Sequence, residues 1–378
     1  MGIVRLTNSA ILRGPGRGPL AYVANSMKLV MTLRTRDQAD IVDAVLSFHL
    51  NAGVDFVIAT DHRSEDGTVE TLESYAEEGV LRLIRETGEE VRGSEWRTRM
   101  ARMAAAEYEA DWTFSCDGDE FWWPRGGSLK DVLDAVPGRY GIVRCPVSEF
   151  VARPDDGSSF SERMTVRLST RAPMNNPTGA RPAVMKVVHR ADPAAVVNRG
   201  SHGVYETSLR ALRGWYPIEV LHFPVRSLDQ YERKLVAWGR ALGDRASGRG
   251  YEAHRRGRLS DHFVASTIDD HVLMRGLEQG SLAVDTRLRD VLRALRLPAV
   301  PEGHSRERGF WLPSGGDSLS FPRPGVEEDA AYAAELAMME EADLVRLRRS
   351  ADLIGARLAS LERPKFTSAF ARRRSRPT

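Results

Sequence analysis

The chain has 378 residues, of which 42% are hydrophobic and 28% charged, as in an ordinary soluble globular protein. Its 54 basic and 52 acidic residues give a net charge of +2, which offers no general argument for a nucleic-acid partner. No apolar run approaches the roughly 20 residues that span a bilayer, and the N-terminus lacks the apolar segment of a secretory signal. The two cysteines are too few for a disulfide framework. We therefore expect a cytoplasmic protein with no nucleic-acid partner and at most peripheral membrane contact.

Strand and helix patterns alternate through the first third of the chain, after a tail over residues 1–27 that is rich in Gly, Pro and Arg. The predicted strands are 29–33, 54–59, 80–84 and the segment from Trp112, and the predicted helices between them cover about 41–50, 68–77 and 95–110. This alternation indicates a parallel, doubly wound sheet. In such sheets ligands bind beyond the carboxyl ends of the strands.

The pattern changes after about residue 125. Further strands are predicted at 140–146, 184–189 and 220–224, and helices at 129–135 and 227–241. A long polar connection over 153–181 carries turn signals, and a loop of this length in a compact domain is usually functional or mobile.

The rest of the chain predicts three segments. Residues 246–326 form a mostly helical extension, 327–363 one long helix, and 364–378 a basic tail. The long helix carries an apolar face that either pairs with a partner helix, which would make a homodimer, or covers its own domain.

The most informative motif is an acidic cluster directly after the strand from Trp112. Asp117, Asp119 and Glu120 form a D-x-D-E block. Carboxylates this close raise one another's pKa unless a cation holds them, and Mg²⁺ or Mn²⁺ typically takes one or two carboxylates together with phosphate oxygens. A polar turn is the alternative interpretation. Polar groups at Arg34 and Asp61 also follow strands, and this convergence favours a metal site at one edge of the sheet.

Four pieces of the chain, in the correct order at element ends, resemble family 2-type glycosyltransferases with a GT-A fold. They are residues 33–37, 48–55, 61–68 and 117–121. The resemblance covers about residues 28–240 and is closest to the branch whose signature is a D-x-D-E-F block. It implies a Rossmann-like α/β fold: a mixed sheet flanked by helices, with a helical C-terminal extension. The glycosyltransferase domain would cover 28–245, with a nucleotide-sugar half at 28–125 and an acceptor half at 126–245.

The resemblance implies a metal-dependent hexosyltransferase that moves a sugar from a nucleotide-diphosphate sugar to an acceptor hydroxyl with inversion. Mn²⁺ or Mg²⁺ would be the cofactor, and the acceptor could be a glycan, a glycolipid or a natural product. Two alternatives stay open. One is a non-catalytic sugar-binding or scaffold relative that assembles through the C-terminal helix. The other is a sugar-nucleotide pyrophosphorylase, which the lack of a glycine-rich loop after the first strand disfavours.

The resemblance also assigns site residues. The implied metal ligands are Asp117, Asp119 and His222, with Asp119 ranked first and Glu120 either ligating or orienting its neighbours. The implied contacts to the nucleotide and its diphosphate are Thr32, Leu33, Arg34, Asp61, Arg99, Asp117, Arg226 and Lys234. In this family a second acidic residue often follows directly after the one at the position of Asp61. In this chain His62 stands at that place, which leaves the role of Asp61 open.

Several of these assignments have structural alternatives. The alternative for Arg97 and Arg99 is a position on the solvated surface instead of a contact to the nucleotide. For Trp122 and Trp123, packing of at least one ring in the core is favoured over stacking on a sugar. The general base is the least constrained role, because the family's usual acidic pair is missing. His202 ranks first and Glu149 second.

Overall fold

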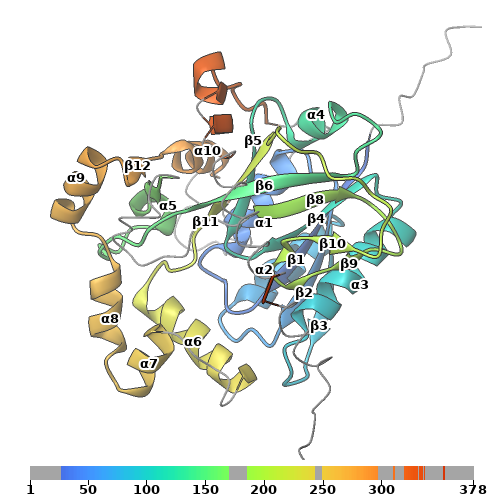
Figure 1. The fold of residues 1–378 in the computed structure, drawn as a ribbon. Coiled ribbons are helices and arrows are strands. Elements are labelled where there is room, and N and C mark those ends of the chain that lie inside the picture. The colour runs from blue at the N-terminus through green and yellow to red at the C-terminus, as the bar shows by residue number, and fades with distance from the viewer. Residues whose placement is uncertain are drawn as a thin grey trace, which may run out of the picture.

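The computed structural model describes residues 27–169, 185–242, 249–296, 310, 319–330, 332–334, 336 and 352–353. The tails expected at 1–27 and 364–378 lie outside the described residues, apart from Met27, and so does most of the helix expected at 327–363. Within the described part, an eight-stranded sheet with the order β3-β2-β1-β4-β8-β6-β11-β5 forms the centre of the molecule (Figure 1).

The first half of the sheet is parallel, as the alternation predicts. It consists of β1 (Leu29–Thr35), β2 (Phe56–His62), β3 (Leu81–Glu86) and β4 (Trp112–Asp117), connected by α1 (Val42–Asn51), α2 (Thr68–Glu77) and α3 (Gly93–Ala106). In the register of these strands, Arg34 lies opposite Asp117 and Thr35 lies opposite Asp61. The polar strand ends therefore meet at one edge of the sheet.

The second half makes the sheet mixed. It contains β5 (Glu120–Pro124), β6 (Ile142–Glu149), β8 (Met185–Arg190) and β11 (Ile218–His222). β8 is antiparallel to β4 and β6, β11 is parallel to β6, and β5 is antiparallel to β11. The expected mixed sheet flanked by helices is confirmed. β5 is not among the predicted strands, and it places Glu120 directly opposite His222.

Aromatic side chains of β5 fill the core beneath the acidic turn. Trp122 and Trp123 are both buried, which confirms the packing interpretation. The backbone N–H of Trp122 donates a hydrogen bond to Nε2 of His49, a fully buried residue of α1, at 3.0 Å. Packing and a buried hydrogen bond thus hold in place the strand that directly follows the acidic turn.

Short elements surround the sheet. They are α4 (Leu129–Asp134), α5 (Phe160–Arg163), β7 (Val166–Leu168), β9 (Val196–Val197), η2 (Arg199–Ser201), β10 (Val204–Tyr205) and β12 (Leu282–Val284). The larger helices are α6 (Leu228–Leu242), α7 (Arg249–Arg255), α8 (Leu259–Ser266), α9 (Asp270–Glu278) and α10 (Arg287–Leu295). The described part of the extension over 246–326 is mostly helical, as expected. Among the described helices none has the length and apolarity needed to cross a membrane.

Candidate functional site

A cleft of about 630 Å³ lies at the carboxyl ends of β1 and β4. The loop after β1, the first turn of α3, the turn after β4, η2, the end of β11 and one face of α6 all contribute lining residues. The lining is strongly charged, and its members include Arg34, Arg97, Asp117, Asp119, His222 and Lys234. A binding site at this edge of the sheet is the arrangement that the strand ends predict.

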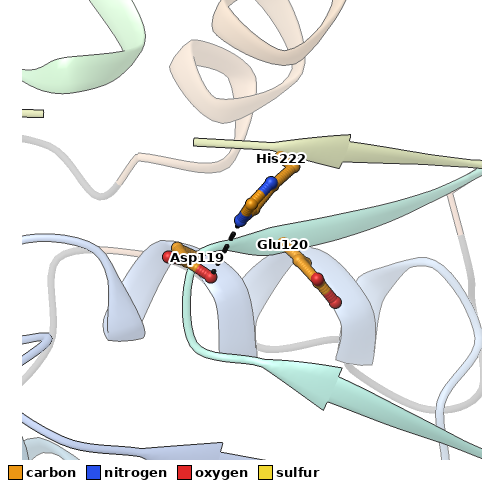
Figure 2. A group of neighbouring side chains, drawn as sticks. All are labelled: Asp119, Glu120 and His222. Carbon is orange, nitrogen blue, oxygen red and sulfur yellow. Dashed lines mark ion pairs between the residues drawn. The ribbon is translucent and has the colours of Figure 1, made fainter. Parts of the chain in front are cut away.

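Asp119 and His222 approach each other across this cleft. The pairing of β5 with β11 sets them side by side, with Nε2 of His222 3.5 Å from Oδ1 of Asp119 (Figure 2). The other ring nitrogen, Nδ1, donates to Oε2 of Glu149 at 2.8 Å. Burial alone would lower the pKa of His222, but the carboxylates of Glu149 and Asp119 outweigh it and raise the pKa to about 10.

This pair fits a divalent cation. One ligand atom each from Asp119, Glu120 and His222 lies within 4.8 Å of the others. A metal-binding histidine normally donates its second ring N–H to a carboxylate, which fixes its tautomer and orientation, and Glu149 does this here. Carboxylate ligands suit Mn²⁺ and Mg²⁺, and imidazole is a common ligand of divalent transition metals. Asp119 and His222 can therefore hold such an ion in exchange for the Nε2 proton of His222, with Glu149 orienting the ring.

Lys234 supplies positive charge on the open side of the cleft. Its ammonium lies 3.1 Å from Oδ2 of Asp119 and 3.1 Å from the carbonyl oxygen of Pro224. Burial would raise the pKa of Asp119, but Lys234 and His222 outweigh it and hold that pKa well below its usual range. Asp119 is thus ionised and available as a ligand at neutral pH.

Asp117 has a different environment from Asp119. Its Oδ1 accepts from Nη2 of Arg97 at 2.5 Å and from Nη2 of Arg34 at 3.3 Å, while Oδ2 accepts from Nζ of Lys186 at 2.9 Å. Burial opposes ionisation, but these three cations outweigh it and hold the pKa of Asp117 well below its usual range. Asp117 does not belong to the group of Asp119, Glu120 and His222 whose ligand atoms lie within 4.8 Å of one another, so the geometry favours Asp119 and His222 over Asp117 as metal ligands.

The other predicted contacts to the nucleotide separate into two groups. Arg34 and Lys234 line the cleft, whereas Thr32 and Leu33 lie inside β1, where Thr32 donates to the carbonyl of Phe114 and Leu33 packs in the core. Asp61 is buried and accepts hydrogen bonds from Thr35 and Ser64, outside the cleft lining. Its contacts are those of a strand-end turn.

On α3 the cleft residue is Arg97 rather than Arg99. Arg97 is 3% exposed and pairs with Asp117, while Arg99 points to the surface and pairs with Glu86. The sequence carries a signal for this: Arg97 precedes Ala101 by one helical turn, and both lie on the buried face of α3. Lys186, which lies between two buried apolar residues of β8, is a second residue at the acidic turn that sequence reasoning did not single out.

Arg226 is committed to the interior. It is 1% exposed, makes a bidentate pair with Asp40 at 2.6 and 2.8 Å, and donates to Oε1 of Gln38 at 2.7 Å. A Cβ at Gly118 would lie 3.0 Å from Cγ of Gln38, so only glycine fits easily between the two aspartates of the turn. From this position Arg226 holds Gln38 against the acidic turn, and this role fits its contacts better than binding of a diphosphate does.

The two candidates for the general base also differ. His202 is exposed, and its Nδ1 lies 2.9 Å from the carbonyl oxygen of Met185, beside the cleft-lining Gly200. Glu149 is hydrogen-bonded to His222 and is not among the residues that line the cleft.

Comparison with known proteins places the chain in no family. No family model matches it, and no curated protein matches either. Among solved structures it is similar to S. aureus TarS in complex with UDP-GlcNAc, with 13% identity, a TM-score of 0.31, and coverage of 63% of this chain and 72% of that one.

Two further structures give matches of the same kind. The mannosyltransferase PcManGT from Pyrobaculum calidifontis in complex with GDP-Man and Mn²⁺ has 15% identity, a TM-score of 0.32, and coverage of 71% of this chain and 79% of that one. Glucosyl-3-phosphoglycerate synthase from Mycobacterium tuberculosis with Mn²⁺ and UDP has 14% identity, a TM-score of 0.23, and coverage of 44% and 57%. Scores this low assign neither a family nor an activity.

Proposed function

We propose that the chain is a metal-dependent, inverting glycosyltransferase of GT-A type that moves a sugar, of the hexose kind, from a nucleotide-diphosphate sugar to an acceptor hydroxyl. The observation that carries the proposal is the joint placement of Asp119 and His222 with Arg34 and Lys234 in one cleft at the strand ends. A cation-binding pair beside basic side chains is what a departing diphosphate requires.

Each residue of the site has a separate role in this proposal. Bound Mn²⁺ or Mg²⁺ would supply Lewis-acid stabilisation of the charge on the leaving diphosphate. Asp119 and His222 would hold the ion, Glu149 keeps the His222 ring oriented, and Lys234 adds positive charge at the mouth of the site. His202 remains the first candidate to accept the acceptor's proton, because Glu149 is already engaged with His222.

The proposal is tested with a panel of UDP, GDP and dTDP sugars, assayed for transfer and for slow hydrolysis with Mn²⁺ or with EDTA. We expect turnover that needs the metal, and we expect Asp119→Asn to lower it by at least about 100-fold. Asp134→Asn, an exposed carboxylate on α4, is the matched control and should keep wild-type rates. A wild-type protein without turnover and without Mn²⁺-dependent binding of any nucleotide diphosphate would instead be a scaffold.

A further inference from the structure

Lys186 is a buried lysine directly behind the acidic turn. It is 4% exposed, and its Nζ lies 2.9 Å from Oδ2 of Asp117 and in ion-pair contact with Oε1 of Glu120. Removing an ammonium group from water costs several kcal/mol unless carboxylates compensate it. A lysine at this depth therefore has to be explained by the two carboxylates that it bridges.

The carboxylates of the turn are divided between two sides. Lys186 and the carboxylate of Glu120 lie on the inner side. Oε1 of Glu120 contacts Lys186, and Oε2 accepts a hydrogen bond from the backbone N–H of Asp117 at 3.2 Å. Asp119 lies on the cleft side with His222. In Figure 2 the Glu120 carboxylate extends away from the contact between Asp119 and His222.

We propose that Lys186 is a resident cation of the acidic turn, which occupies Asp117 and Glu120 so that the chain binds one divalent ion, through Asp119 and His222 alone. Glu120 lies close enough to share a three-ligand site with these two residues, but it serves as the counterion of Lys186. Lys186 is then a positioning residue. This inference rests on the proposed metal-dependent function, since it specifies how many ions that site takes and which side chains hold them.

The first test titrates the full-length protein with Mn²⁺ alone and measures free Mn²⁺ by electron paramagnetic resonance. We expect one ion per wild-type chain. Asp119→Asn should weaken binding by about 100-fold or more, as loss of a ligand does, whereas Glu120→Gln should leave the affinity within about threefold of wild type. If Glu120→Gln weakens binding as much as Asp119→Asn, the three-ligand site is correct and the proposal is overturned.

The second test removes the resident cation. Lys186→Met keeps the unbranched chain of lysine up to its last atom but not its charge, so the released carboxylates of Asp117 and Glu120 should take a second, weaker Mn²⁺. The double variant Lys186→Met/Glu120→Gln and the conservative Lys186→Arg should each return to one ion. A folded Lys186→Met protein that binds one ion with wild-type affinity contradicts the proposal. If Lys186→Met does not fold, the Glu120→Gln titration decides alone.

The two proposals fail in different ways. A wild-type chain that binds no Mn²⁺ refutes the metal dependence of the proposed function. A wild-type chain that binds one ion, combined with loss of binding in Glu120→Gln, refutes only the role given to Lys186.

Discussion

Each carboxylate of the acidic turn has its own set of cations, and these come from different elements. β1 and α3 supply Arg34 and Arg97 to Asp117, and α6 supplies Lys234 to Asp119. The like-charge argument from the sequence requires a compensating cation and identifies it as a metal ion. The chain supplies cations to both aspartates, three of them to Asp117, and only Asp119 has ligand atoms grouped with those of His222, so the metal hypothesis concerns Asp119 and His222.

Arg97→Met tests whether the buried pair with Asp117 holds the turn in place. The change leaves the carboxylate with Arg34 and Lys186 only, so we expect the free energy of unfolding to fall by about 1–3 kcal/mol, the usual cost of losing a hydrogen bond to a charged group. Nucleotide-diphosphate affinity should fall as well, because Arg97 lines the cleft. Urea denaturation and calorimetric titration with UDP and GDP measure the two effects.

Arg99→Met is the matched control on the same helix. Its pair with Glu86 is solvent-exposed, and such pairs contribute between 0 and about 1 kcal/mol. If both variants behave alike, Arg97 has no special role at the site.

His49 makes stability depend on pH. Burial lowers its pKa to about 4, against the smaller opposing effect of its hydrogen bond to Val45, whereas in the unfolded chain the pKa is about 6.5. Between these values the unfolded chain binds a proton that the folded chain does not, so the stability contributed above pH 6.5 is lost as the pH falls towards 4. Between about pH 7.5 and 5 the loss is about 2 kcal/mol.

The measurement is urea denaturation of wild type and His49→Gln at both pH values. We expect the pH dependence of the variant to be smaller by about 2 kcal/mol. His271→Gln, an exposed histidine of α9, should keep the wild-type dependence. Equal pH dependence in wild type and His49→Gln would show that this residue does not titrate on unfolding.

At the scale of elements, the sequence predicts local structure well and non-local pairing poorly. The helix predicted at 68–77 is present with the same bounds, because its apolar spacing and flanking Gly67 are local features. The pairing of β5 with β11 joins segments about a quarter of the chain apart, so the contact between Asp119 and His222 follows from no local pattern. Only the resemblance predicted that the two residues act together.

A second buried charge network joins α10 and β12 to the sheet. Arg287 donates to Oε2 of Glu219 at 2.9 Å and to Oδ2 of Asp285 at 2.7 Å, and Glu219 is 2% exposed. Arg287→Met leaves Glu219 buried without this partner. We expect the free energy of unfolding to fall by about 2–3 kcal/mol, after allowance for the one-third exposure of the arginine.

Two comparisons make this prediction specific. Arg289→Met removes a surface pair on the same helix and should cost less than about 1 kcal/mol. The double variant Arg287→Met/Glu219→Gln should recover part of the loss, because it removes the buried charge as well as its partner. No recovery would mean that the packing of Arg287, and not its charge, stabilises this junction.

At the scale of the whole molecule, Phe321, late in the chain, belongs to the same core as β5. The ring of Phe321 lies 4.6 Å from that of Trp123 and 5.7 Å from that of Phe48, and its backbone exchanges hydrogen bonds with Gly127. The sequence predicts only a mostly helical extension over 246–326. Its docking could not be predicted, because one aromatic residue in an irregular segment has no periodicity to show which face is buried.

Phe321→Ala therefore should destabilise the entire domain rather than release a separate appendage. Phe321 is 4% exposed, and truncation of a buried phenylalanine to alanine costs about 3–5 kcal/mol through lost burial and the cavity left behind. Val326→Ala, at a side chain that is 87% exposed, should change the free energy of unfolding by less than about 0.5 kcal/mol. Mn²⁺ binding in the folded Phe321→Ala protein should persist, because Trp123 lies towards the far end of β5 from the turn that carries Asp119. A single unfolding transition shifted to lower urea supports this view, whereas an unchanged transition would mean that the segment around Phe321 is not part of the core.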